Sequence, residues 1–178
     1  MAASTIPDGE LTEGLEMLAQ SEAKAIYVVD SFGAFYSEQI HYLVKKYLHH
    51  CKPAGKEVGM HMHNNMQLAF ANTIEGIIEG ANFLDATMAG LGRGAGNCQM
   101  ELLLAFLHNP QYKLRPVLDC VQNHIEPMRS KLLWGYDLPY LLTGMLNQHP
   151  RTAIKFKEAE ITGQKGDVLA FHDMVTDQ

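Results

Sequence analysis

The sequence predicts an α/β fold in which a partial (β/α)8 TIM barrel, with about four parallel strands, is followed by a helical extension. Short apolar runs such as Ala25–Asp30 alternate with longer segments whose apolar residues recur at helical spacing. Continuous apolar runs are typical of strands that are buried on both faces of a parallel sheet. After Asn97 the strand-like runs stop and only helical patterns follow.

The βα units follow one another along the first part of the chain, and right-handed crossovers join such units into a parallel sheet or barrel. The expected elements are, in order, the tail of a strand at residues 1–4, a short helix carrying Leu11, Leu15 and Leu18, the strand 25–30, a helix from Ser37, the strand 57–63, the helix 66–80 and the strand 83–87. The apolar face expected for the helix 66–80 consists of Ala71, Ile74, Ile77 and Ile78.

The second part of the chain carries helical patterns alone. The expected helices are a short one carrying Met100, Leu103, Leu104 and Leu107, a longer one over 112–132 and a third over about 138–148. We therefore divide the chain into a barrel part at residues 1–110, a helical extension at 111–150 and a tail of unknown role at 151–178. The tail is polar and mixed, and it shows no motif.

Composition indicates a globular intracellular protein. With 178 residues, 47% hydrophobic and 19% charged, the chain is long enough for one core. A net charge of −6 argues against nucleic acid or an anionic membrane surface as a partner. Three unevenly spaced cysteines suggest no disulfide framework and favour the reducing cytoplasm. No apolar run approaches the ~20 residues of a membrane span, and no signal peptide is visible.

Two histidines, His61 and His63, lie two residues apart at the end of an apolar run. On a strand, residues i and i+2 point to the same face, roughly 7 Å apart along the chain. Two neutral imidazoles so placed are able to bind one divalent cation. The alternative is a pair of strand-end histidines that are hydrogen-bonded to the backbone.

A loop rich in glycine follows the next strand and ends in Asn97. Its four alternating glycines are Gly90, Gly92, Gly94 and Gly96. Such a loop is often only a turn that needs positive φ, and the frame of a phosphate-binding loop is absent. Because the histidine pair and this loop lie at the tips of neighbouring strands, we expect them to form one site.

The pattern H-x-H-N, the pair Ala71-Asn72 and the loop G-x-G-x-x-A-G-N together resemble the pyruvate carboxyltransferase domain of the DRE-TIM metallolyases. The branch of 4-hydroxy-2-oxovalerate aldolases fits best. Asn65 stands where the related synthases have aspartate, and the loop GLGRGAGN lacks their glutamate. The segments YVVDSFGAF (residues 27–35) and GYDLPY (residues 135–140) are also similar to aldolase segments.

The resemblance implies a lyase that cleaves a 4-hydroxy-2-oxo acid into pyruvate and an aldehyde with the help of Mn²⁺ or Mg²⁺. His61, His63 and Asn97 match metal-binding positions of the family, and imidazole with oxygen ligation suits these ions. Tyr140 matches a tyrosine near the reacting hydroxyl, where it would donate a proton. Arg93 would hold the substrate carboxylate. The alternatives are a tyrosine with a satisfied hydroxyl and a solvated loop arginine.

The resemblance also implies that the chain is the C-terminal half of a barrel, because the family's strand with an Asp-Arg-Glu-like motif has no counterpart here. We expect such a truncated half-barrel to self-associate, to aggregate or to be marginally stable, and to show little or no turnover by itself. As in related aldolases, the resemblance implies an aldehyde dehydrogenase as a partner. Two alternatives stay open: an acyl-CoA-dependent 2-oxo acid synthase of the isopropylmalate or homocitrate type, and a non-catalytic barrel fragment.

Asp30 ends a predicted strand, at the edge where barrels place their chemistry. Its carboxylate would either orient a ligand histidine or cap the turn that follows, and we favour the cap.

Overall fold

A computed structural model describes residues 3–164 and 166–177 of the chain. Its sheet contains the parallel strands β1 (Ala25–Asp30), β2 (Glu57–Met62) and β3 (Phe83–Leu84), in that spatial order. Ala25 lies opposite Glu57, and Gly59 lies opposite Phe83. The α/β architecture with parallel strands is confirmed, with three strands in the described residues instead of about four.

Two strand predictions need correction. The segment Ala3–Thr5 forms a turn of 3-10 helix (η1) rather than the tail of a strand, and residues 1–2 of that prediction lie outside the described part. The strand β3 stops at Leu84 instead of residue 87 because the chain changes partners there. Thr87 donates its backbone N–H to the Cys98 carbonyl at 3.0 Å, so the strand end pairs with the segment after the glycine loop.

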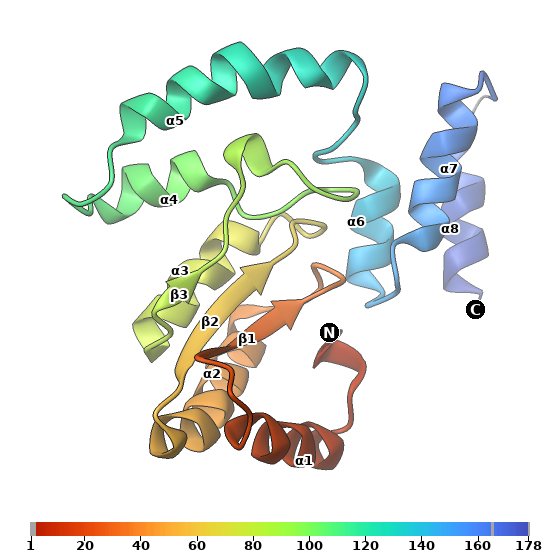
Figure 1. Cartoon of the computed structure of the whole chain (residues 1–178). Helices are drawn as coiled ribbons and strands as arrows, with labels where there is room; N and C mark the ends of the chain where they lie inside the picture. The colour runs from red at the N-terminus through yellow and green to blue at the C-terminus, as the bar shows by residue number, and fades with distance from the viewer. Residues whose placement is uncertain (1–2, 165, 178) are drawn as a thin grey trace.

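Three helices, α1 (Asp8–Ala19), α2 (Ser37–Cys51) and α3 (Ala69–Glu79), flank the sheet, and α2 and α3 lie behind it in Figure 1. The strand residues that enter this core are Ile26, Val28, Val58, Met60 and Met62, all buried. The opposite face of the sheet carries Tyr27, Val29, His61, Phe83 and Asp85, which are partly or largely exposed. One face of the sheet is therefore core, and the other is accessible.

The buried face of α3 differs from the predicted one. Its buried residues are Ala69, Asn72, Thr73 and Gly76, whereas Ile78 is 69% exposed. The reason is the close approach of the helix to β2: a Cβ on Gly76 would lie 2.6 Å from the Met60 side chain. Small residues fit that narrow space, whereas Ile74 packs at the edge of the core and Ile78 faces away from it.

Helices continue to the end of the described chain. They are α4 (Met100–Leu107), α5 (Leu114–Cys120), the π turn η4 (Val121–Ile125), the 3-10 turn η5 (Glu126–Ser130), α6 (Leu138–Met145), α7 (Arg151–Ile161) and α8 (Val168–Thr176). The predicted helix 112–132 is a continuous run of turns whose pitch changes before Pro127, since proline offers no N–H to the preceding turn.

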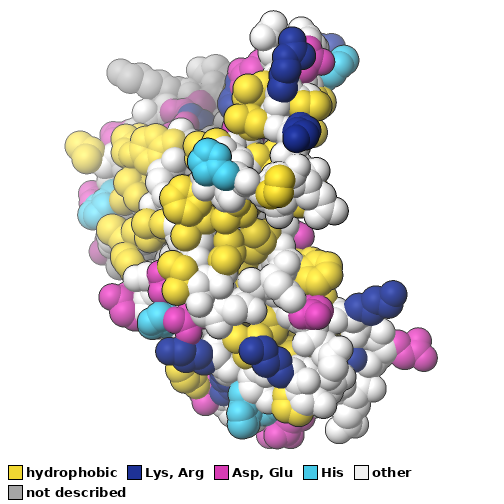
Figure 2. All heavy atoms as spheres, turned by 90° about the vertical axis from the view of Figure 1, so that its left-hand side faces the viewer, with side chains coloured by type: hydrophobic (Ala, Val, Ile, Leu, Met, Phe, Trp, Pro, Cys, Tyr) yellow, Lys and Arg dark blue, Asp and Glu magenta, His cyan; other side chains and the backbone are white. Residues whose placement is uncertain are grey.

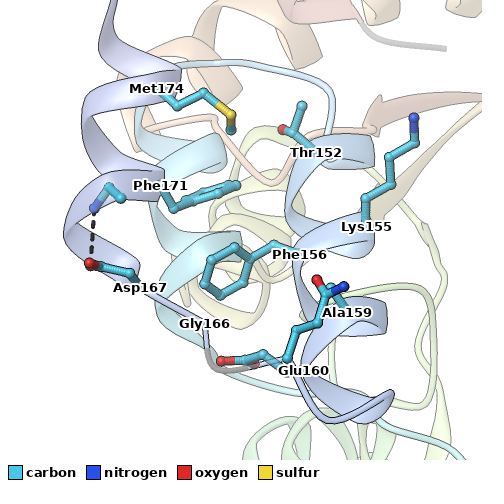
Figure 3. A pocket seen from close by; sticks show the side chains of 11 residues that line it. Thr152, Lys155, Phe156, Ala159, Glu160, Gly166, Asp167, Phe171 and Met174 are labelled. Carbon is cyan, nitrogen blue, oxygen red and sulfur yellow. Dashed lines mark hydrogen bonds between the residues drawn. The ribbon is translucent and has the colours of Figure 1, made fainter.

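The tail, which shows no motif in the sequence, forms α7 and α8. The rings of Phe156 and Phe171 lie 4.9 Å apart between the two helices and line a groove of about 480 Å³ (Figure 3). The carboxylate of Asp167 accepts the N–H groups of Leu169 and Ala170 and so caps α8. Both helices lie beside α6 (Figure 1).

Large apolar side chains are exposed on β3, α4 and α5, including Phe83, Leu102, Phe106 and Leu118. Figure 2, which looks onto the left-hand side of Figure 1, shows hydrophobic side chains gathered over this face. Self-association of the chain through such a surface stays a prediction. Within residues 3–164 and 166–177, no helix combines the length and the apolar character needed to cross a membrane.

Candidate metal centre

The two histidines lie together at the carboxyl end of β2. Their ring centroids are 5.1 Å apart, with an angle of 72° between the ring planes. The backbone of His63 forms a bridge with Asn97, and the Asn64 N–H donates to the Gly96 carbonyl at 2.9 Å. The fold thus brings the histidine pair and the end of the glycine loop to one place.

In each imidazole, Nδ1 lies within hydrogen-bond distance of an acceptor oxygen. His61 Nδ1 lies 3.0 Å from Asp85 Oδ2, and His63 Nδ1 lies 2.9 Å from the Asp30 carbonyl oxygen. Because a carboxylate and a carbonyl only accept hydrogen bonds, both Nδ1 atoms carry the proton when the rings are neutral. The lone pair then lies on Nε2 in both rings, as in histidines that bind metals.

Burial keeps the His63 ring neutral. Desolvation lowers the pKa of His63 to about 4, against the stabilising hydrogen bond to the Asp30 carbonyl, and the charges of His61 and Arg93 lower it further. A neutral imidazole is the form that a cation can bind. At neutral pH His63 is therefore ready to act as a ligand.

The same pKa makes the metal-free fold sensitive to acid. The unfolded chain binds a proton at His63 near pH 6.5, whereas the folded chain binds it only near pH 4. The unfolded state thus gains protons first, so the His63 contribution to stability is full above pH 6.5 and is lost as the pH falls toward 4. We expect His63→Asn to reduce the fall in unfolding free energy between pH 7 and 4.5, measured by urea titration. The exposed His124, replaced by asparagine, should leave that fall unchanged.

Asn97 and Thr87 supply oxygen atoms beside the histidines. Asn97 Nδ2 donates to the Leu91 carbonyl at 3.1 Å, which leaves Oδ1 as the free acceptor. Among the described residues, Asn97 Oδ1 and Thr87 Oγ1 are buried without a hydrogen-bond partner. Both residues line a cavity of about 230 Å³, together with His61 and Asp85.

These donors fit a divalent cation. A buried oxygen without a partner costs about 1–3 kcal/mol, and a bound ion would remove that cost. Two imidazole nitrogens with an amide oxygen form a mixed nitrogen and oxygen set, and both atom types are ligands of divalent cations in proteins. The structure therefore brings together the three predicted ligands, His61, His63 and Asn97.

Asp30 both caps the turn after β1 and orients a histidine, but different groups of the residue do so. The carboxylate accepts the N–H groups of Ala34 and Phe35, each at 3.0 Å, and so caps the turn after β1. The carbonyl oxygen orients His63. Burial raises the pKa of the Asp30 carboxyl, and the backbone hydrogen bonds of the turn oppose this rise.

The remaining predicted residues, Arg93 and Tyr140, differ in exposure and in their contacts. Arg93 is exposed, donates to the Ser31 carbonyl at 2.9 Å, and acts on the charge state of His63. Tyr140 is buried, and its ring packs against Gly94, where a Cβ would lie 3.1 Å from it. Burial raises the Tyr140 pKa, and the nearby charges are Asp137, Lys157 and Glu158, on the α6–α7 side. Its role as proton donor stays a prediction.

Asp85 is the residue that the sequence analysis missed. It directly follows β3, and an acidic residue at a strand end was the available signal. A second cluster joins α2 to α3, where His41 Nδ1 lies 3.2 Å from Glu75 and 2.5 Å from Glu79. Lys45 also pairs with Glu79, at 3.3 Å, so we interpret this cluster as an ion-pair network between helices.

Known proteins are similar to this chain in sequence and fold. A 4-hydroxy-2-oxovalerate aldolase of Geobacillus stearothermophilus is 34% identical over an alignment of 148 residues, which covers 76% of this chain and 42% of the relative. An oxaloacetate decarboxylase of Mycobacterium tuberculosis is 46% identical over 85 residues, which are 47% of this chain and 24% of the relative. The chain thus spans less than half of the length of these curated relatives.

Solved structures agree. The N-terminal domain of a candidate aldolase from Bacteroides vulgatus superposes with a TM-score of 0.66 and 32% identity, over 85% of this chain and 52% of that one. The carboxyl transferase domain of Rhizobium etli pyruvate carboxylase, 17% identical, shares the fold with a TM-score of 0.63 over 89% of this chain and 28% of that one. The family model described as HMGL-like matches residues 1–125. The chain therefore belongs to the HMGL-like family.

Proposed function

We propose that this chain carries the metal-binding part of an aldolase-type carbon–carbon lyase, which releases pyruvate and an aldehyde from a 4-hydroxy-2-oxo acid in the cytoplasm. The observation that carries the proposal is the pair of imidazoles with both Nδ1 atoms engaged, beside the free Oδ1 of Asn97. The relatives named 4-hydroxy-2-oxovalerate aldolase support the choice of substrate class.

In this proposal His61, His63 and Asn97 hold Mn²⁺ or Mg²⁺. The bound ion supplies Lewis acidity, which favours negative charge on the oxygen of a 2-oxo group during carbon–carbon cleavage. Arg93, exposed at the edge of the site, binds the substrate carboxylate through its guanidinium fork. The hydrogen bond to the Ser31 carbonyl leaves other guanidinium N–H groups available for that contact.

The test is pyruvate release from 4-hydroxy-2-oxopentanoate by the 178-residue chain, followed through lactate dehydrogenase with Mn²⁺ present. We expect a low rate that disappears with EDTA and in His63→Ala, because the resemblance gives this chain no counterpart of the family's catalytic arginine. Release that persists without metal would contradict the proposal. Acetyl-CoA-dependent condensation without cleavage would instead indicate the synthase alternative.

A second candidate is decarboxylation of oxaloacetate, favoured by the 46% identity to the mycobacterial decarboxylase. Both reactions break the bond between the third and fourth carbons of a 2-oxo acid and yield pyruvate. Supplying oxaloacetate in the same assay separates them, since one produces carbon dioxide and the other an aldehyde. Tight Mn²⁺ binding with neither product would favour the non-catalytic fragment.

A further inference from the structure

Tyr27 lies on the accessible face of the sheet, next to the histidine site. It is opposite Gly59 in the β1–β2 register, and Gly59 is opposite Phe83 in the β2–β3 register. A Cβ on Gly59 would lie 2.5 Å, 2.6 Å and 2.7 Å from three ring carbons of Tyr27. The tyrosine ring therefore lies across β2, in the space that the missing side chain leaves open.

Because the ring lies over Gly59, it extends from β1 toward the β3 side of the sheet, where Asp85 follows the strand. His61 follows Gly59 by two residues and Asp85 follows Phe83 by two residues, so these side chains share the face of Tyr27. Burial raises the pKa of Tyr27, and the charge of Asp85 and a hydrogen bond with its carboxylate raise it further. Asp85 thus contacts Tyr27 and the His61 ring, whose Nδ1 lies 3.0 Å from Oδ2.

The geometry points to Tyr27 as a positioning residue, which holds the Asp85 carboxylate in the orientation that keeps the proton of His61 on Nδ1 and its lone pair on Nε2. This inference rests on the proposed metal site and deepens it. The linked side chains Tyr27, Asp85 and His61 come from β1, from the end of β3 and from β2. The absence of a side chain at Gly59 leaves the space that the Tyr27 ring occupies.

The two histidines differ in a way that explains the need for Tyr27. His63 is oriented by a backbone carbonyl, which β1 fixes in place. His61 is oriented by a side chain that is 48% exposed and is free to rotate if nothing else holds it. A second hydrogen bond to the same carboxylate removes that freedom, as outer partners do in metal sites.

The experiment uses Tyr27→Phe, which keeps the ring on Gly59 and removes only the hydroxyl. Nitrogen-15 NMR of the metal-free chain reports which nitrogen of each histidine is protonated. We expect the Nδ1–H fraction of His61 to fall while that of His63 stays unchanged. Calorimetry should show the Kd for Mn²⁺ rising about 10-fold, the lower end for loss of an outer partner. The matched control is Tyr42→Phe, which removes a tyrosine–carboxylate hydrogen bond to Asp8 between α1 and α2.

A second variant tests the clearance. Gly59→Ala retains the hydroxyl but pushes the Tyr27 ring away, so we expect the same change at His61, and the double variant should add nothing further. An unchanged His61 tautomer and an unchanged Kd in Tyr27→Phe would overturn the inference. Because the NMR measurement needs no metal, failure of the wild-type chain to bind Mn²⁺ would reject the proposed site separately from the role of Tyr27.

Discussion

His63→Ala is expected to abolish Mn²⁺ binding, with the Kd rising at least about 100-fold. The variant removes a half-buried, neutral imidazole and leaves His61 as the one nitrogen ligand of the proposed site. Calorimetric titration of the metal-free chain with Mn²⁺ measures the effect, and His61→Ala should match it.

The controls locate the ion. His124→Ala alters an exposed histidine and should leave the Kd unchanged. His41→Ala should also leave it unchanged, although His41 lies beside two glutamates that could attract a cation. If binding survived in His63→Ala and vanished in His41→Ala, the ion would belong to the cluster between α2 and α3, and the centre proposed at the strand ends would be wrong.

Gly96→Ala is expected to lower the unfolding free energy by about 3 kcal/mol or more, and to weaken Mn²⁺ binding with it. Gly96 has φ of +84°, a region in which an L side chain costs roughly 1–2 kcal/mol. A Cβ there would also meet the Gly90 carbonyl oxygen at 2.1 Å, and this carbonyl accepts the N–H of Asn97. The substitution should therefore shift the loop that positions the amide ligand. Urea unfolding and calorimetry with Mn²⁺ measure the two effects.

Gly163→Ala is the control that tests the cost of a positive φ without a steric clash. Gly163 has a similar φ of +92°, and a Cβ there would meet nothing within 4 Å. Its replacement should cost only about 1 kcal/mol and leave Mn²⁺ binding intact. An equal loss of unfolding free energy in Gly96→Ala and Gly163→Ala would show that the clash with the Gly90 carbonyl contributes nothing.

Local pattern was sufficient for the parts of the fold that depend on neighbouring residues. Continuous apolar runs predicted the parallel strands, and helical spacing predicted α1 and α2. The two-residue spacing of His61 and His63 predicted that their rings share a face, because alternation is a property of any strand. The resemblance then added Asn97, which the structure places beside the pair.

Periodicity failed where packing decided the outcome. The buried face of α3 follows the narrow gap above Met60, so its small residues are inside and Ile78 is outside. The helices α7 and α8 lie in a segment without a sequence motif, and their packing depends on contacts between distant residues such as Phe156 and Phe171. Sequence periodicity gives no information on the width of the gap between a helix and a strand, or on which distant residues will be in contact.

By itself, the sequence determined the class of fold, the histidine pair and the glycine loop of this protein. Only the tertiary structure decided which atoms complete the site: the Asp30 carbonyl behind His63, Asp85 behind His61, and the Tyr27 ring across Gly59. The reason is that each of these contacts joins different strands. Such contacts depend on register, and a shift of one residue would turn every side chain of a strand to the other face.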